Sequence, residues 1–373
     1  MFKKPRLSAA LTVLVAALAS SGGAAADERH DRPSSACRPT AATMLRACSY
    51  DVGDDFFTTL ANCNNISDSN DRRACQRGAR AARRDNAAEC IDVFRARRNA
   101  CDLLGEDRYD PDPLLNPANE FIDPDDIPDS YPVNPYVSLA AGHTHVLRAD
   151  DEIVVVHATD QSRDILGVAC RVVVDIVVEA DGEGPDTEYE AVEVTDDWFA
   201  QDVLGNVYYC GEVARNYEDG VLRDLDGSFE AGIEFAKSGE LIRVAPVAGD
   251  AHRQEFALGE AEDIVQYLDT MASPGDDEGG ENLAFPCNSG CLRTFDFAPI
   301  DPASTEYKYY LPGTGFVLAV GLEDGEITGE REELVCVGDS LDVLSDPGCG
   351  IDNTEALLEE LCRLSPDAFC SDD

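Results

Sequence analysis

The stretch that decides the fold is Gly167-Val-Ala-Cys-Arg-Val-Val-Val-Asp-Ile-Val-Val-Glu179. It is dense in β-branched residues, which suit the pleated surface of a strand. Side chains alternate between the two faces of a strand, so every second residue shares a face. One face is apolar and consists of Cys170, Val172, Val174, Ile176 and Val178. The other face carries Arg171, Asp175 and Glu179. We therefore expect the first face to be buried, and Arg171 and Asp175 to be exposed.

The neighbouring segments extend this strand into a sheet. A second run, 191–201, contains the single tryptophan, and a third, 206–212, follows the turn 202–205. Long strands joined by Gly/Asp turns are typical of an antiparallel meander. Further strand-like runs lie at 143–148, 152–159, 221–234, 241–246, 253–258, 291–298, 304–311, 315–321 and 326–337, while 260–270 is ambiguous between helix and strand. This series predicts a mainly antiparallel β domain over 137–337, either a β-sandwich or a half-barrel.

Six cysteines before this domain form a symmetric set. They lie at 37, 48, 63, 75, 90 and 101, so their spacings read the same in both directions. Paired from the outside inward, each pair has the same sum of residue numbers, as two antiparallel helices require. The predicted pairs are Cys37–Cys101, Cys48–Cys90 and Cys63–Cys75, which would make 27–104 a disulfide-laddered antiparallel helical hairpin. Because Gly53 lowers helix propensity, we also expect it to kink or interrupt the first helix.

The chain begins with the features of a signal peptide over 1–26. A basic start precedes an apolar run, 7–19, that is too short to span a bilayer comfortably, and 24–26 is a small-residue cleavage site. The fourteen cysteines, an even number, suit an oxidising compartment. We therefore expect a secreted or periplasmic protein with no transmembrane segment after cleavage. Cys170 either pairs with Cys210 or stays a buried thiol, and the other pairings remain open.

Charge divides the rest of the chain. Residues 27–120 hold 14 arginines against 17 acids, whereas 121–373 hold 12 cations against 57 acids, within a formal net charge of −45. Such a field repels nucleic acid, so we expect no nucleic-acid partner. Residues 105–136 form a Pro/Asp-rich linker, and 338–373 form a cysteine-containing tail with a short helix. The overall prediction is an α+β protein.

Several phrases of the β domain together resemble an uncharacterised family of secreted bacterial antiparallel β-proteins. The resemblance covers about 134–337 and implies an exported β fold. It implies no activity and no catalytic residues. The phrases that carry it are Asn134-Pro-Tyr, Leu166-Gly-Val-Ala-Cys-Arg-Val-Val173, Trp198-Phe-Ala-Gln-Asp202, Gly205-Asn-Val-Tyr-Tyr209 with Gly211-Glu212, and Glu306-Tyr-Lys-Tyr-Tyr-Leu-Pro-Gly313.

Two groups of residues are candidate sites. His143 and His145 share a strand face and have a spacing that can chelate Zn²⁺ or Cu²⁺, although exposed strand histidines are the more common case. Trp198, Tyr307 and Tyr309 could bind a ligand by stacking, although tryptophan is more often a core residue.

The sequence contains no nucleophile elbow, P-loop or H-E-x-x-H motif. We therefore favour an exported, soluble, non-enzymatic binding or scaffold protein without a cofactor, in which the hairpin docks to a protein or glycan partner outside the cytoplasm. One alternative is an exported hydrolase or carbohydrate-active protein that uses paired acids near Trp198. The other is a metal-binding protein that uses His143 and His145.

Overall fold

A computed structural model describes residues 36–105, 108–127, 132–182, 184–323 and 325–370. The predicted signal peptide, 1–26, lies outside the described residues. The α-helices are α1 (Cys37–Asn64), α2 (Ser69–Leu104), α3 (Thr354–Leu364) and α4 (Pro366–Phe369). Short 3-10 helices are η1 (Pro113–Leu115), η2 (Pro124–Asp126), η3 (Gly184–Asp186), η4 (Asp276–Glu278), η5 (Gly280–Asn282), η6 (Leu341–Ser345) and η7 (Pro347–Cys349).

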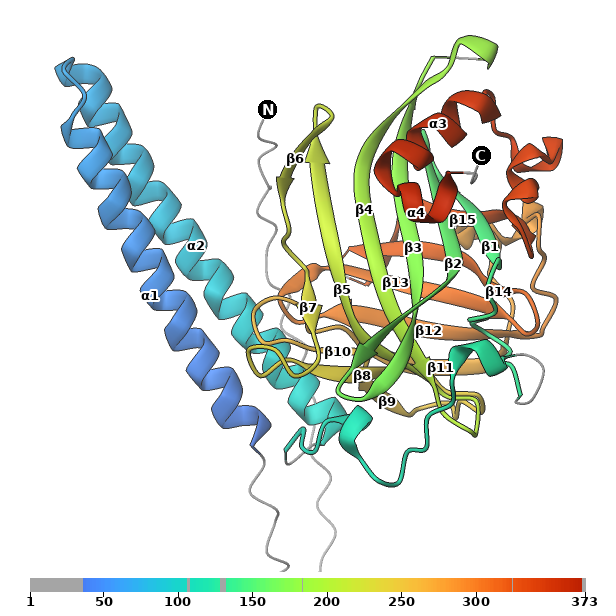
Figure 1. Cartoon of the computed structure of the whole chain (residues 1–373). Helices are drawn as coiled ribbons and strands as arrows, with labels where there is room; N and C mark the ends of the chain where they lie inside the picture. The colour runs from blue at the N-terminus through green and yellow to red at the C-terminus, as the bar shows by residue number, and fades with distance from the viewer. Residues whose placement is uncertain (1–35, 106–107, 128–131, 183, 324, 371–373) are drawn as a thin grey trace, which may run out of the picture. The chain divides into compact units, whose positions relative to one another are not determined.

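Helices α1 and α2 form the predicted hairpin (Figure 1). Disulfides join Cys37 to Cys101, Cys48 to Cys90 and Cys63 to Cys75, which are the three pairs that the symmetric spacing predicts. The carboxylate of Asp68 caps α2 by accepting from the backbone of residues 70 and 71. Helix α1 is continuous through Gly53, so the expected interruption does not occur. The disulfides on either side of Gly53 hold that part of α1 against α2.

The rest of the chain forms one large, antiparallel, barrel-like sheet that is nearly closed. Its first eight strands are β1 (Thr144–Ala149), β2 (Glu152–Ile165), β3 (Val168–Asp181), β4 (Glu188–Gln201), β5 (Val207–Glu218), β6 (Val221–Asp224), β7 (Phe229–Glu230) and β8 (Lys237–Ile242). The others are β9 (Ala251–Arg253), β10 (Glu255–Phe256), β11 (Ile264–Ala272), β12 (Cys291–Ala298), β13 (Asp301–Leu311), β14 (Gly315–Glu323) and β15 (Glu326–Gly338). The half-barrel alternative therefore describes the fold, and the ambiguous segment 260–270 contributes to a strand.

The two ends of the sheet meet at one short segment. Neighbouring strands run in the order β10-β8-β5-β4-β3-β2-β1-β15-β14-β13-β12-β11-β9. Strands β9 and β10 are consecutive in the chain, with Gln254 between them; β9 pairs with β11, and β10 pairs with β8. The backbone N–H groups of Gln254 and Glu255 both donate to Asp263 O. This seam lets the inner face enclose a common interior.

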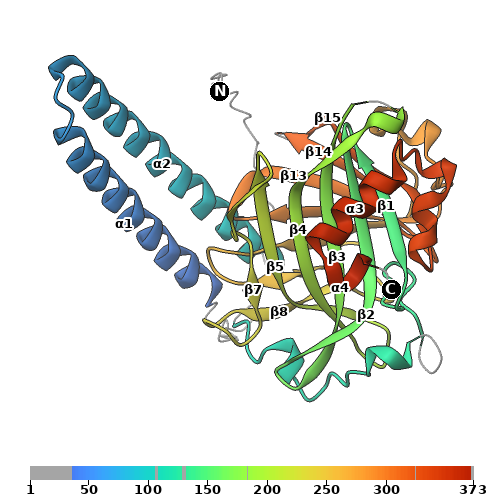
Figure 2. The same cartoon turned by 45° about the horizontal axis from the view of Figure 1, so that its top comes forward.

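The C-terminal helices cover the outer face of the long strands. Figures 1 and 2 show α3 and α4 lying against β2, β3 and β4. Val174, Ile176 and Val178 pack in one cluster with Leu357 and Leu361 of α3. The predicted apolar face of Gly167–Glu179 is therefore buried, and helix α3, capped by Asn353, is part of what buries it.

The opposite face of this strand corrects our expectation. Arg171 is only 1 % exposed, and its guanidinium donates to Leu139 O and to Asp125 Oδ1, at 3.2 and 3.0 Å. Asp175 is partly buried rather than exposed. The prediction was wrong for Arg171 and Asp175 because this face looks into the interior of the nearly closed sheet, where opposite strands and the Pro/Asp-rich segment cover it, whereas Glu179 near the end of β3 is exposed.

The Pro/Asp-rich segment packs against the sheet. Its apolar residues Ile122, Ile127 and Tyr136 are buried, and they join an inner cluster that includes Val173 of β3 and Tyr267 of β11. This cluster fills one part of the interior. Four further disulfides stabilise the sheet and tail: Cys170–Cys210, Cys287–Cys291, Cys336–Cys349 and Cys362–Cys370. The bridge Cys170–Cys210 settles the choice left open for Cys170.

Candidate binding chamber

Carboxylates from both halves of the sheet face the same interior. Asp175 on β3 is influenced electrostatically by Asp197 on β4, by Glu332 on β15 and by Lys308 on β13. Strand β13 is far from β3 in the strand order, so these side chains meet across the interior rather than along the sheet. Acidic residues are disfavoured in strands and costly to bury. Their repeated inward placement therefore needs a compensating interaction.

A cavity of about 920 Å³ is lined by Lys308 and Glu332, among other residues, while Asp175 and Asp197 are not part of its lining. Small-molecule sites commonly have volumes of about 300–1,000 Å³. We call this cavity, together with the inward carboxylates beside it, the chamber. Ten of the cavity's lining residues are Asp or Glu, and two are Lys or Arg. The lining residues include Asp263, Asp296, Glu306, Lys308 and Glu332.

Lys308 is shared between two carboxylates. Its Nζ lies 2.9 Å from Glu306 Oε1 and 3.8 Å from Asp296 Oδ2. Burial alone would lower the pKa of Lys308, but Glu306 and Asp296 raise it well above its ordinary value. Asp296 is 5 % exposed, and its Oδ1 accepts from the Thr294 hydroxyl. Its Oδ2 has no hydrogen-bond partner within the described chain. A buried carboxylate oxygen on the cavity wall is therefore left incompletely satisfied.

The other carboxyls of the chamber also have raised pKa values. Burial raises the pKa of Glu332 to about 7, with Lys308 opposing and Glu306 adding to the rise. Burial raises that of Asp296 to about 6, against the lowering effect of Lys308. For Asp175, burial and then the charge of Asp197 raise the pKa well above its usual range. Each shift arises because a carboxylate loses hydration while lying near other negative charges.

A tyrosine joins two further acids deeper in the sheet. Asp197 on β4 lies directly opposite Glu212 on β5. The Tyr209 hydroxyl donates to Asp197 Oδ1 and lies 2.9 Å from Glu212 Oε2. Burial raises the pKa of Glu212 to about 7, although the bond to Tyr209 opposes the rise. A β-bulge between Trp198 and Phe199 sets the register that brings the tyrosine to both acids.

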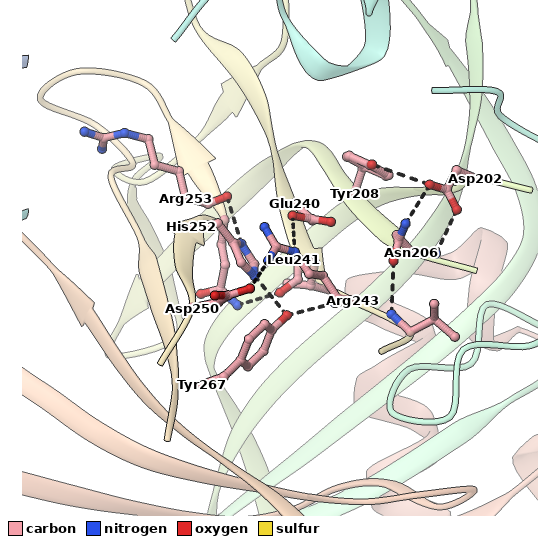
Figure 3. A network of polar contacts seen from close by, with 12 residues as sticks. Asp202, Asn206, Tyr208, Glu240, Leu241, Arg243, Asp250, His252, Arg253 and Tyr267 are labelled. Atoms are coloured by element: carbon pink, nitrogen blue, oxygen red, sulfur yellow. Dashed lines mark hydrogen bonds and ion pairs between the residues drawn. The ribbon is translucent and has the colours of Figure 1, made fainter. Parts of the chain in front are cut away.

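A second polar network fixes the strands near the seam, as Figure 3 shows. The Tyr267 hydroxyl accepts from the Arg243 backbone N–H at 2.8 Å and lies 2.9 Å from His252 Nε2. Burial, and then the charge of Arg243, lower the pKa of His252 to about 3, so its neutral ring accepts from Tyr267. The Arg243 guanidinium also binds Glu240 and Asp250, at 2.9 and 3.0 Å. These bonds connect the loop after β8 to β9 and β11.

The predicted histidine pair lies apart from the cavity's lining. His143 Nε2 is 3.2 Å from His145 Nε2, while His143 Nδ1 is 3.1 Å from Asp339 Oδ1. His145 Nε2 also lies 3.2 Å from Thr314 O. Burial, and then the neighbouring His143, lower the pKa of His145 to about 4. His157 lies opposite Thr144, so it does not join the pair. In the part of the chain that the structure describes, no three His, Cys, Asp or Glu side chains converge to hold one metal ion.

Of the predicted aromatic residues, Tyr307 and Tyr309 lie together on β13, with the Arg293 guanidinium 3.9 and 5.5 Å from their ring centroids, whereas Trp198 lies elsewhere. Trp198 is buried beside the Cys170–Cys210 disulfide, with the Arg163 guanidinium 4.0 Å from its ring centroid. It faces the opposite side of β4 from Asp197. Tyr309 is fully buried, whereas Tyr307 is partly exposed on the outer side of β13. An aromatic groove that includes Trp198 is therefore not formed.

Sequence reasoning missed the chamber itself. The available signal was the presence of acids inside strands, together with Lys308, one of only two lysines beyond the predicted signal peptide. The sequence pattern places Asp175, Asp197 and Glu212 within strands, but it shows neither that they share one face, which depends on register and a β-bulge, nor that this face is enclosed. That property depends on the pairing of strands far apart in the chain.

No family model matches the chain, and no curated protein matches it. A crystal structure of a Bacteroides fragilis protein described as having a YmcC-like fold is similar at 12 % identity, with a TM-score of 0.26, over 55 % of this chain and 98 % of that chain. Among the described residues, no helix is both long and apolar enough to cross a membrane.

Proposed function

We propose that this is an exported binding protein whose chamber holds a small organic molecule carrying more than one positive charge. The observation that carries the proposal is the wall of the cavity, where ten acidic residues, five of them at least partly buried, accompany two cations. Among these acids, the buried Asp296 Oδ2 has no hydrogen-bond partner among the described groups. A bound ammonium or guanidinium would donate to these oxygens and offset their mutual repulsion.

The spread of the acids favours an extended organic cation. They come from strands on different sides of a cavity of about 920 Å³, whereas a metal ion draws its oxygen ligands to within about 2.0–2.6 Å of one point. Lys308 already makes the kind of contact expected of such a ligand, since its ammonium lies between the carboxylates of Glu306 and Asp296. A polyamine, or the side chains of a short basic peptide, would extend this arrangement. The protein would act as a carrier or sensor, with no reaction required.

Export is the second part of the proposal. Seven disulfides and no free cysteine among the described residues suit an oxidising compartment. With the predicted signal peptide, this supports a secreted or periplasmic location. We also propose the division into signal peptide (1–26), hairpin (27–104), connecting segment (105–136), β domain (137–337) and tail (338–373). The hairpin would provide a separate surface for a protein or glycan partner.

Calorimetric titration with spermidine at low salt, in an amine-free buffer, tests the chamber. We expect one saturable site, and we expect Glu332→Gln and Asp296→Asn each to weaken binding about 10- to 100-fold, because each removes a charged acceptor. Glu359→Gln, which changes an exposed acid on α3, is the matched control and should bind as the parent does. Equal affinity in all four proteins would contradict the proposal, as would preference for Ca²⁺ over the polyamine.

The histidine pair supports a second candidate function, metal binding. Two nitrogens bound to one tetrahedral Zn²⁺ at about 2.0–2.1 Å lie roughly 3.3 Å apart, close to the 3.2 Å between His143 Nε2 and His145 Nε2. The Asp339 carboxylate would hold the proton on His143 Nδ1 and leave Nε2 free to bind. Metal analysis of tag-free protein after Zn²⁺ dialysis should find one ion per chain. Equal zinc content in His143→Ala and His145→Ala would rule this site out.

A further inference from the structure

The geometry of Asp197, Tyr209 and Glu212 indicates how many protons the two carboxyl groups share. Two carboxyl groups face each other on adjacent strands, where like charges directly opposite are destabilising. One hydroxyl contacts both groups, but it has a single proton to donate. If Tyr209 donates to Asp197, the contact with Glu212 is a hydrogen bond only when Glu212 is protonated and donates to the tyrosine oxygen. The arrangement is therefore complete with one proton held between the two carboxyls.

The surroundings of this cluster are also acidic. Asp175 faces it from β3, Glu193 from β4, Glu255 from β10 and Asp263 from the loop before β11. Asp196, on the other face of β4, binds Arg215 at 2.9 Å. No basic side chain is among the largest influences on Asp197 or Glu212. These neighbours therefore favour retention of a proton while the chamber is empty.

The cluster is connected to the wall of the cavity. Asp263 lines the cavity, and its charge acts on both Glu212 and Glu255. The Glu255 backbone N–H also donates to Asp263 O, which fixes the two residues beside each other. A positive charge placed against Asp263 would therefore reduce the negative potential that the cluster experiences. Reduced negative potential makes a carboxyl release its proton more readily.

We propose that the chamber takes up its cationic ligand in exchange for a proton released from the Asp197–Tyr209–Glu212 cluster. This inference rests on the proposed function and adds its regulation. The carboxyl of Glu212 loses its O–H proton to solvent, and the resulting carboxylate charge is offset by the bound cation. Binding is then tighter at pH 8 than at pH 6, because at the higher pH less work is needed to remove the proton. An acidic compartment would favour release of the ligand.

Spermidine titrations at pH 6.5, in buffers with different ionisation enthalpies, count the protons released on binding. We expect about one proton or more per ligand for the parent protein, and about 0.5–1 fewer for Glu212→Gln. The glutamine amide can still donate to Tyr209, so the cluster keeps its geometry without a releasable proton. Tyr209→Phe is a second variant, in which Glu212 loses its hydroxyl partner and the pH dependence should change. Glu359→Gln should match the parent.

The outcomes separate the two proposals. Absence of spermidine binding at both pH 6 and pH 8 would overturn the proposed function and this inference with it. Saturable binding with no proton release, or with equal release from the parent and Glu212→Gln, would overturn the exchange alone. A ¹³C NMR titration of the Glu212 carboxyl, with and without spermidine, gives a direct readout. Its midpoint should fall when the ligand is present.

Discussion

The raised pKa values of the chamber predict that the ligand-free protein loses stability as the pH rises. A carboxyl whose pKa is higher in the folded state than in the unfolded state binds its proton more tightly when folded. Its contribution is therefore present below the unfolded pKa and is lost as the pH rises through the folded pKa. For Glu332 this window runs from the ordinary value of 4.5 to about 7.

The structure gives the size of this effect for a single substitution. A change from 4.5 to about 7 corresponds to at most about 3 kcal/mol. Because Glu332 retains some exposure, we expect about 2 kcal/mol. The unfolding free energy of the parent protein should fall between pH 5 and pH 8. In Glu332→Gln that fall should be smaller by about 2 kcal/mol. Urea denaturation of the oxidised protein in amine-free buffers measures the loss.

The matched control for this experiment is Glu359→Gln. Glu359→Gln removes one negative charge from the exposed side of α3, so its pH profile should follow that of the parent. The reasoning is refuted if the parent protein is as stable at pH 8 as at pH 5. It is refuted equally if Glu332→Gln and Glu359→Gln change the profile by the same amount.

Substitutions at three other sites test the framework around the chamber. Replacing Cys48 and Cys90 together by Ala should lower the unfolding free energy by about 2–4 kcal/mol, measured by denaturant titration without reductant; no change would mean that the outer and inner disulfides suffice. Arg97 binds Glu262 through two nitrogens in a buried contact between α2 and the segment before β11. Glu262→Gln should therefore lower the unfolding free energy by about 3–5 kcal/mol in the same titration. The double variant with Arg97→Met should lose less unfolding free energy than the sum of the two single variants. Val174→Asp places an unpaired charge beneath α3 and should prevent folding, whereas a cooperative thermal transition in that variant would contradict the packing of this face.

The hairpin could be predicted in detail because its information is local. The six cysteines of the hairpin, paired from the outside inward, give a constant sum of residue numbers, which is the pattern of antiparallel pairing. The buried side of Gly167–Glu179 was also predictable, since a run of alternating Val and Ile must pack against something. Which element covers it, helix α3, could not be read from the strand, because α3 begins at Thr354, far along the chain.

The inner face could not be predicted, for a different reason. Asp175 and Arg171 alternate with apolar residues as they would in a strand with one face in water. An inward acid and a solvent-facing acid therefore give the same pattern, until closure through the short β9–β10 segment is known. The contacts of Lys308 with Asp296 and of Tyr209 with Glu212 depend on register and on a β-bulge, which periodicity does not report.

A crystal structure of the protein saturated with spermidine tests the central claim most directly. The account predicts electron density for the polyamine inside the sheet, with one of its nitrogens within hydrogen-bond distance of Asp296 Oδ2 and another near Glu332. Density only on the outer surface, or an empty chamber in crystals grown under conditions where calorimetry shows full occupancy, would contradict it.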